Sequence, residues 1–377
     1  MPPALDASSG AAIVEAAGIS KRNFALSDAQ APTRPGRNLD YPFGETRPET
    51  GQTIEVAPGL HWIRMRLPMQ LNHINLWLLE DGDGWTAIDT GIRDEPTATA
   101  WKQLFDGPMQ GKPIKRVIVT HMHPDHVGMA GWLVRRFGVE LWMSRTDYLM
   151  CRNLCADTGQ EAPQEGIRFY RAAGFPEEQL EQYKTRFGGF GKGVYPMPNA
   201  YHRMIEGDKI SIGKRVWEVV VGRGHAPEHV CLWCREENIF ISGDQLLPRI
   251  SSNVSLFPTE PEGDPLRDWL ESCAKLKDLL PKDILVLPSH NEPFRGAHLR
   301  LQELIDGHET GMDKVLALCI EPKRAVDVFP ALFRAKITSG NFGMATGESL
   351  AHLNCLRKRG AITRQADAEG VEWYSTV

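Results

Sequence analysis

Four residues whose side chains bind metals fall within six positions of the sequence, in the run HMHPDH. They are His121, His123, Asp125 and His126. Imidazole nitrogens and carboxylate oxygens are the ligands that Zn²⁺ and similar divalent ions prefer. Any one of these histidines could be a hydrogen-bonded core residue, but the density of the whole run favours a metal site.

Three further candidate ligands follow, each at the point where a predicted strand ends. His225 lies in the run GHAPEH, Asp244 in SGDQ and His290 in PSH. Loops at strand ends commonly present catalytic groups. We therefore expect the three loops to converge on the HMHPDH run.

In this order and context the motifs resemble those of the metallo-β-lactamase superfamily. Its hydrolases carry an HxHxDH motif, a later GH motif, a GD motif and a final histidine. The resemblance covers about residues 53–293 and points to the glyoxalase II-like and lactamase-beta-like groups. It implies two metal sites with the following ligands: His121, His123 and His225 for the first ion, and Asp125, His126 and His290 for the second.

The resemblance also implies that Asp244 bridges the two ions, so that Asp125 and Asp244 are catalytic as well as metal-binding. The IDTG run at 88–91 matches an upstream motif of the superfamily. In it, Asp89 is expected to orient a histidine ligand and to fix its tautomer. Taken alone, IDTG is a turn that ends a strand.

The chemistry expected from this ligand set is hydrolysis. Two divalent ions lower the pKa of a shared water to roughly 7, and one of them polarises the bond to be cleaved. Zinc is the expected metal, with iron or manganese as alternatives. We predict attack by metal-bound hydroxide on a small acyl substrate, which could be a thioester, a lactone or another ester, since the fold does not choose among them.

Other functions stay open on the same residues. The ligands also suit a phosphodiesterase or ribonuclease, a non-hydrolytic lyase or redox enzyme, and a metal domain that senses a ligand for a DNA-binding regulator. The formal net charge of -5 gives no basic field of the kind that nucleic-acid binding needs. The intact ligand set also argues against a regulator that has lost catalysis.

The elements around the motifs predict an α/β fold, and the resemblance implies a four-layer αββα sandwich. Short β-rich runs indicate strands at 60–65, 74–79, 85–88, 116–120, 140–143, 215–221, 229–234, 239–242 and 284–287. Helical spacing indicates helices at 96–105, 127–137, 266–280 and 297–319. The motifs thus lie on loops between strands and helices.

We divide the chain into three parts. Residues 1–50 are a partly irregular N-terminal extension, residues 51–320 are the metal-binding domain, and residues 321–377 are a small separate domain. A helical insertion is expected at 145–201. The run ATGESLAHLNCLRKRGAI at 345–362 resembles the winged helix appended to lactamase-beta-like hydrolases. Its cationic end also suits a helix C-terminus without any DNA, so we expect a packing or lid role.

Two residues are predicted to contact the substrate. Tyr195 lies in the Gly- and Pro-rich stretch 188–201, which we expect to line the cleft, although a purely structural cap is the alternative. Arg249 could anchor an anionic group, although it could equally be a surface arginine. His229 could support a ligand or pair within its strand, and a metal role is the less favoured alternative. His73 could face the metal cleft, although a histidine in a strand is more often a packing or hydrogen-bonded residue.

The remaining features describe the setting in which the protein acts. No secretory signal and no run of about 20 apolar residues is present, so we expect a cytoplasmic protein without a membrane segment. The seven scattered cysteines predict reduced thiols. We expect a small-molecule substrate and no nucleic-acid partner, and leave a homo-oligomer open.

Overall fold

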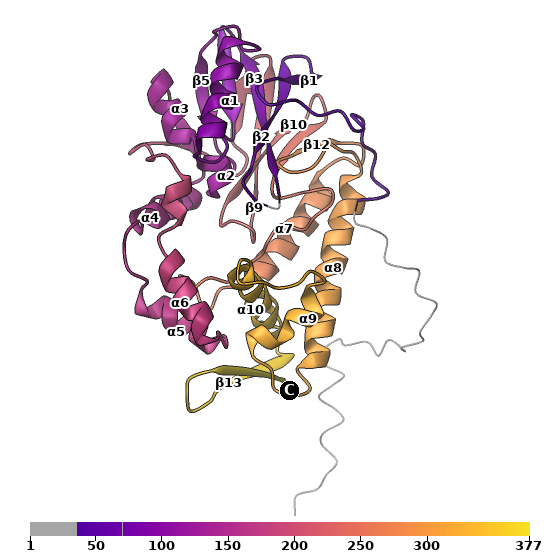
Figure 1. Cartoon of the computed structure of the whole chain (residues 1–377). Coiled ribbons are helices and arrows are strands. Elements are labelled where there is room, and N and C mark those ends of the chain that lie inside the picture. Colours follow the sequence, from indigo (N-terminus) through magenta and orange to yellow (C-terminus); the bar gives the residue numbers. More distant parts are fainter. Residues whose placement is uncertain (1–35, 70) are drawn as a thin grey trace, which may run out of the picture. The chain divides into compact units, whose positions relative to one another are not determined.

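The structure, a computed structural model, describes residues 36–69 and 71–377, and two β-sheets form its centre (Figure 1). The first sheet follows chain order: β1 (Ile54–Ala57), β2 (Leu60–Arg66), β3 (His73–Asp81), β4 (Gly84–Ile88), β5 (Ile114–Ile118), β6 (Leu141–Met143) and β7 (His202–Arg203). The second has the order β12 (Leu285–Pro288), β11 (Ile239–Gly243), β10 (His229–Cys234), β9 (Arg215–Gly222) and β8 (Lys209–Ile212). The expectation for residues 1–35 lies outside the described residues.

The first sheet is buried on both faces. Successive side chains of a strand point to opposite sides, so each strand packs in two directions. Along β3, Leu76 and Leu78 pack with Trp101 of α1 (Glu95–Asp106), while Trp77 and Leu79 pack toward the second sheet. Helix α3 (Ala130–Phe137) also covers the outer face. The sheet is therefore sandwiched between helices and the other sheet.

The second sheet repeats this arrangement. Val219 of β9 and Ile241 of β11 face the first sheet, whereas Val220 and Phe240 face the helices. The covering helices are α7 (Pro265–Leu279) and α8 (Ala297–Leu318), which run beside the sheet in Figure 1. The layers are helix, sheet, sheet and helix, and the predicted αββα sandwich is confirmed.

The predicted helix at 127–137 is instead two elements, α2 (Pro124–Val127) and α3, so this prediction was wrong at its first turn. The chain passes tightly between two segments at Gly128, where an added Cβ would lie 2.4 Å from the oxygen of Pro124 and 2.5 Å from that of Gly91. Strands β1, β7 and β8 were not predicted from the sequence. They are short, and only β8 among them has buried residues, so their apolar signal is weak.

The predicted helical insertion lies between β6 and β7. It contains α4 (Arg145–Ala156), α5 (Gln164–Ala172), α6 (Glu177–Arg186) and a short 3₁₀ turn, η2 (Phe190–Gly193). Aromatic rings pack between α5 and α6, where the ring centroids of Tyr170 and Tyr183 lie 4.6 Å apart. Phe175 lies between these helices in the sequence, and its ring centroid is 5.0 Å from that of Phe342 in the C-terminal region.

The C-terminal region contains η3 (Ala325–Val328), α9 (Phe329–Leu332), α10 (Phe342–Lys358) and a hairpin of β13 (Ile362–Ala366) and β14 (Glu372–Thr376). Leu350 and Leu353 of α10 belong to the same hydrophobic cluster as Trp269 of α7 and Leu301 of α8. The C-terminal region is thus packed into the helical layer of the second sheet. Its winged-helix assignment stays a prediction.

Two sequence-wide expectations concern membranes and cysteines. Among residues 36–69 and 71–377, no helix has the length and apolar character needed to cross a membrane.

All seven cysteines are free thiols.

Helix α10 approaches residues 255–256 so closely that only glycine fits at position 347. A Cβ there would lie 2.7 Å from Ser255 Oγ, whereas one at Gly343 in the same helix would meet nothing within 4 Å. We expect Gly347→Ala to lower the free energy of unfolding by about 1–3 kcal/mol through overpacking. Gly343→Ala should be neutral or stabilising by up to about 1 kcal/mol. Equal effects of the two variants in urea unfolding would contradict this packing.

Candidate metal centre

The seven candidate ligands lie together where strands of both sheets end. His121, His123, Asp125 and His126 follow β5, His225 lies between β9 and β10, Asp244 follows β11, and His290 follows β12. Their donor atoms form three overlapping groups: His121 with His123 and His225, His121 with His126 and Asp244, and Asp125 with His126 and His290. Within each group the donor atoms lie within 4.8 Å of one another.

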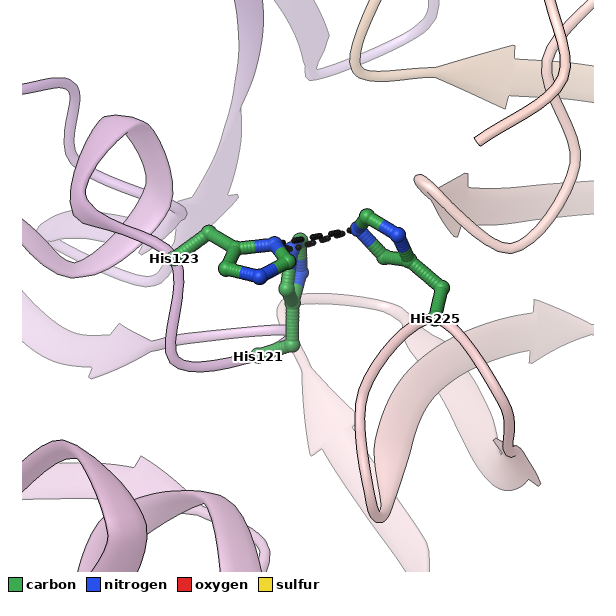
Figure 2. Close-up of side chains that lie close together, drawn as sticks. All are labelled: His121, His123 and His225. Carbon is green, nitrogen blue, oxygen red and sulfur yellow. Dashed lines mark hydrogen bonds between the residues drawn. The ribbon is translucent and has the colours of Figure 1, made fainter. Parts of the chain in front are cut away.

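The first group consists of three histidines whose ring nitrogens face one another (Figure 2). Nδ1 of His123 lies 2.9 Å from Nε2 of His121 and 3.0 Å from Nε2 of His225, and the last two atoms are 3.3 Å apart. A tetrahedral ion with metal–nitrogen bonds of about 2.0–2.1 Å separates its ligand atoms by about 3.3 Å. The spacing of these nitrogens is close to that value.

In three imidazoles, the ring nitrogen that faces away from the cluster is hydrogen-bonded to a carbonyl or carboxylate oxygen. Nδ1 of His225 donates to the carbonyl of Asn253 at 2.7 Å, and Nδ1 of His290 donates to that of His73 at 2.8 Å. Nδ1 of His126 donates to a carboxylate at 2.8 Å. Because a carbonyl or carboxylate oxygen only accepts, the ring proton must sit on Nδ1. When such a ring is neutral, as a metal ligand must be, its Nε2 presents a lone pair to the centre of the cluster.

The carboxylate that holds His126 belongs to Asp89. Its two oxygens also accept from the backbone amide of Thr120 at 2.8 Å and from the Thr120 hydroxyl at 2.9 Å. Since that hydroxyl donates to Asp89, it can accept from Nδ1 of His121 at 3.0 Å. Asp89 adopts a φ of 60°, a strained value for a residue other than glycine that is typical of functional sites.

The second group contains the carboxylates. Nε2 of His290 lies 3.5 Å from Asp125 and 3.4 Å from Oδ1 of Asp244, and Nε2 of His126 lies 3.5 Å from that same oxygen. The other oxygen of Asp244 lies 3.4 Å from Nε2 of His225. The Asp244 carboxylate thus faces both groups, one oxygen toward each.

Two buried atoms of the cluster have no hydrogen-bond partner among the described residues. They are Nε2 of His126 and Oδ1 of Asp244. A buried polar atom without a partner costs free energy, and such atoms in a folded protein call for an unseen partner. A divalent cation between these atoms would satisfy both, so the donor set fits metal ions.

The electrostatics differ between the two groups. Burial and the neighbouring His225 lower the pKa of His123 to about 3, which keeps that ring neutral. Burial opposes charge on Asp125 and His290 as well. For Asp125, the positive charges of His126 and His290 outweigh burial and lower the pKa to about 2. For His290, the negative charges of Asp244 and Asp125 outweigh burial and raise the pKa to about 10. The carboxylate half of the cluster therefore attracts positive charge.

His229 lies behind the cluster rather than in it. Its Nε2 accepts the backbone amide of Asp244 at 3.0 Å, and its ring stacks on His121 with centroids 4.5 Å apart. His73 accepts the amide of Asn291 and contacts the His290 ring. Both histidines thus accept backbone amides in the loops that carry Asp244 and His290.

The two predicted substrate residues contact other side chains. Tyr195 is flanked by Arg93 and Arg135, at 5.6 and 5.4 Å from its ring centre. Arg249 pairs with Glu292 at 2.9 Å and lies over the ring of Tyr41. Their roles toward a substrate stay predictions.

A cavity of about 120 Å³ borders His225. Its apolar wall includes Met122, Ala226 and Leu256, together with Met150 of α4. Helix α4 belongs to the insertion that we expected at the cleft. The insertion therefore contributes a side chain to the space beside a candidate ligand, although from Met150 rather than from Tyr195.

Sequence reasoning missed Asp147, which connects two ligand-bearing loops. This buried carboxylate accepts the backbone amide of Met122 at 3.0 Å and that of Glu228 at 2.8 Å. Met122 lies between His121 and His123 in the chain. The only sequence signal is the spacing of Ser144 and Asp147, which resembles a helix N-terminus and gives no indication of a site.

Two segments of the chain match known protein families. The family described as "Metallo-beta-lactamase superfamily" matches residues 70–290. The family described as "Metallo-beta-lactamase-like, C-terminal domain" matches residues 312–377. The first range contains all seven candidate ligands.

Solved structures and curated proteins agree with these matches. A beta-lactamase domain protein from Burkholderia ambifaria is 40% identical, with a TM-score of 0.83 over 91% of this chain and 99% of its own. A metallo-beta-lactamase family protein from Thermus thermophilus is 26% identical, with a TM-score of 0.72 over 86% and 100%. The probable metallo-hydrolase YqjP of Bacillus subtilis is 25% identical over 80% of this chain and 93% of its own. The acyl-coenzyme A thioesterase MBLAC2 of Gallus gallus is 25% identical over 65% and 82%.

Asp147 provides a test of how the ligand loops are held. Asp147→Ala leaves the buried amides of Met122 and Glu228 without an acceptor, at about 1–3 kcal/mol for each. We expect the free energy of unfolding in urea to fall by about 2–5 kcal/mol. The control is Glu165→Ala in α5, whose ion pair with Arg168 is exposed and should contribute less than about 1 kcal/mol. If Asp147→Ala lowers the free energy of unfolding no more than the control does, Asp147 does not hold the two ligand loops together.

Proposed function

The chain belongs to the metallo-beta-lactamase superfamily, and on that premise we propose that it is a two-metal hydrolase of a small acyl substrate, with a thioester as first choice. The observation that carries the proposal is the convergence of seven side chains whose donor atoms face one another inside the protein. The likeness to a probable metallo-hydrolase supports hydrolysis as the reaction type.

In this proposal the cluster would hold two ions. His121, His123 and His225 would hold the first, and Asp125, His126 and His290 would hold the second. Asp244 would serve both, since its two oxygens face different groups. Imidazole and carboxylate suit zinc, which is our expected metal, while iron and manganese accept the same ligands.

When bound, two divalent ions would supply an acidified water and an electrophile for the acyl oxygen. The protein's own contribution is to orient the ligands and to receive a proton. Asp89 and the carbonyl of Asn253 hold His126 and His225 in the tautomer that aims Nε2 inward. Asp125, whose side chain keeps 19% of its surface exposed, is the carboxylate placed to accept a proton from the attacking water.

The cavity beside His225 supports this choice of substrate class. Its small volume and the methionine and leucine part of its lining suit a short apolar acyl group rather than a polymer. The acidic residues Glu260, Asp264 and Asp268 also border it. Among the relatives, MBLAC2 of Gallus gallus and of Homo sapiens are named acyl-coenzyme A thioesterases, at 25% and 24% identity. We therefore place thioesters ahead of lactones and other esters.

The test is a panel of acyl-coenzyme A thioesters of increasing chain length, a lactone, an aryl ester and bis-p-nitrophenyl phosphate. We expect thioester hydrolysis to give the highest kcat/KM. Asp244→Ala should lower it at least about a hundredfold without loss of the fold, because the residue between the two ions sets their geometry. Faster cleavage of the phosphodiester than of every ester and thioester would overturn the proposal.

Met150 makes the same panel a test of the cavity. Met150→Trp narrows the space, so kcat/KM for the longest acyl chain should fall about tenfold relative to the shortest. The matched control is Leu149→Trp, since the neighbouring Leu149 is 55% exposed and does not line the cavity. If both variants treat long and short chains alike at unchanged metal content, the acyl group does not bind beside Met150.

A further inference from the structure

Residues 251–256 form a segment that contacts the metal cluster on one side and the C-terminal region on the other. Toward the cluster, the Asn253 carbonyl accepts from His225, and the Ser252 hydroxyl donates to the carbonyl of Asp244. Ser252, Val254, Ser255 and Leu256 are buried. The segment therefore supports two of the proposed ligands from behind.

Helix α10 holds the other side of this segment at three points. The amide of Leu256 donates to the carbonyl of Gly347 at 3.0 Å, and Gly347 has no room for a side chain against Ser255. The side-chain amide of Asn253 donates to the carboxyl of Glu348 at 3.0 Å. The C-terminal region is thus bonded directly to the residue that orients His225.

The Asn253 side chain is held firmly between these contacts. Its Nδ2 donates to Glu348, and its Oδ1 accepts from the Ser255 hydroxyl at 2.6 Å. The backbone of Glu348 is held as well, because its carbonyl accepts from Nδ1 of His352 at 2.8 Å, and His352 in turn contacts His308 of α8 at 3.3 Å. A shift of the Asn253 backbone would strain both of its side-chain bonds, so these bonds hold in place the backbone carbonyl that accepts from His225.

We propose that Glu348 of the C-terminal helix α10 is a positioning residue for the metal centre, acting through Asn253 on the tautomer and orientation of His225. This inference rests on the proposed role of His225 as a metal ligand. Outer partners of metal-binding histidines commonly change metal affinity about 10–100-fold when they are removed. The C-terminal region is then part of the metal centre rather than a separate appendage.

The test measures Zn²⁺ affinity of the full-length protein by competition with a chromophoric chelator. Glu348→Ala removes the acceptor for Asn253, and we expect it to weaken one of the two Zn²⁺ sites about tenfold. Glu348→Gln keeps an acceptor oxygen and should restore the affinity to within about twofold of the parent. Asn253→Ala should cause the same loss as Glu348→Ala, and the double variant should lose no more than either single one.

The matched control is Arg359→Ala at the end of the same helix. Arg359 pairs with Glu309 of α8 at 2.8 Å and does not contact residues 251–256. Its loss should lower the thermal unfolding midpoint of the metal-free protein without changing Zn²⁺ affinity. If Glu348→Ala does not fold, Asn253→Ala and Glu348→Gln still decide the question, because the first must weaken the site and the second must not.

His225→Ala separates the inference from the proposed function. A variant of His225 that binds Zn²⁺ like the parent would show that His225 is not a ligand, and the proposed function would fail. If His225→Ala weakens binding but Asn253→Ala and Glu348→Ala do not, the positioning role is overturned and the ligand assignment stands. A Glu348→Gln variant as weak as Glu348→Ala would also overturn it.

Discussion

Three imidazoles of the cluster have the ring nitrogen that faces away from it bonded to a carbonyl or a carboxylate, and the arrangement of the site depends on this constraint. Asp89 holds His126, and backbone carbonyls hold His225 and His290, while the Thr120 hydroxyl contacts Nδ1 of His121. Because these acceptors fix a proton on Nδ1, a neutral ring presents the lone pair of its Nε2 to the cluster. Such a cluster of inward lone pairs and carboxylates is unfavourable without a cation, which is the physical argument for metal ions.

The fold supplies these acceptors by bringing strand ends of both sheets together. Asp89 follows β4, the HMHPDH run follows β5, and Asp244 follows β11, so each is anchored to a buried strand. Asp147 then ties the β5 loop to the His225 loop through two backbone amides. Residues 251–256 close the far side against α10. The rigidity of the site therefore comes from the sandwich, and the insertion and the C-terminal helix are joined to it by a few specific bonds.

The sequence predicted the parts of this arrangement that are local. Four ligands lie in one short run, and strands such as 229–234 are continuous apolar segments, so both have clear signals. The supporting residues lack such a signal, because Asn253 and Glu348 are 95 positions apart and meet only in the folded chain. The helix predicted at 127–137 is interrupted between Val127 and Ala130, although its spacing is helical throughout. Tyr195 was chosen for its loop composition, whereas Met150, on a regular helix, lines the cavity beside His225.

The metal centre as proposed has seven side chains that hold two divalent ions. The most direct measurement is elemental analysis of the full-length protein after saturation with Zn²⁺ and removal of the excess by gel filtration. We expect two zinc ions per chain, because His121, His123 and His225 form one group of donor atoms and Asp125, His126 and His290 form another. Asp244 has one oxygen toward each of these groups. A saturated, folded preparation that retains at most one ion per chain would contradict it.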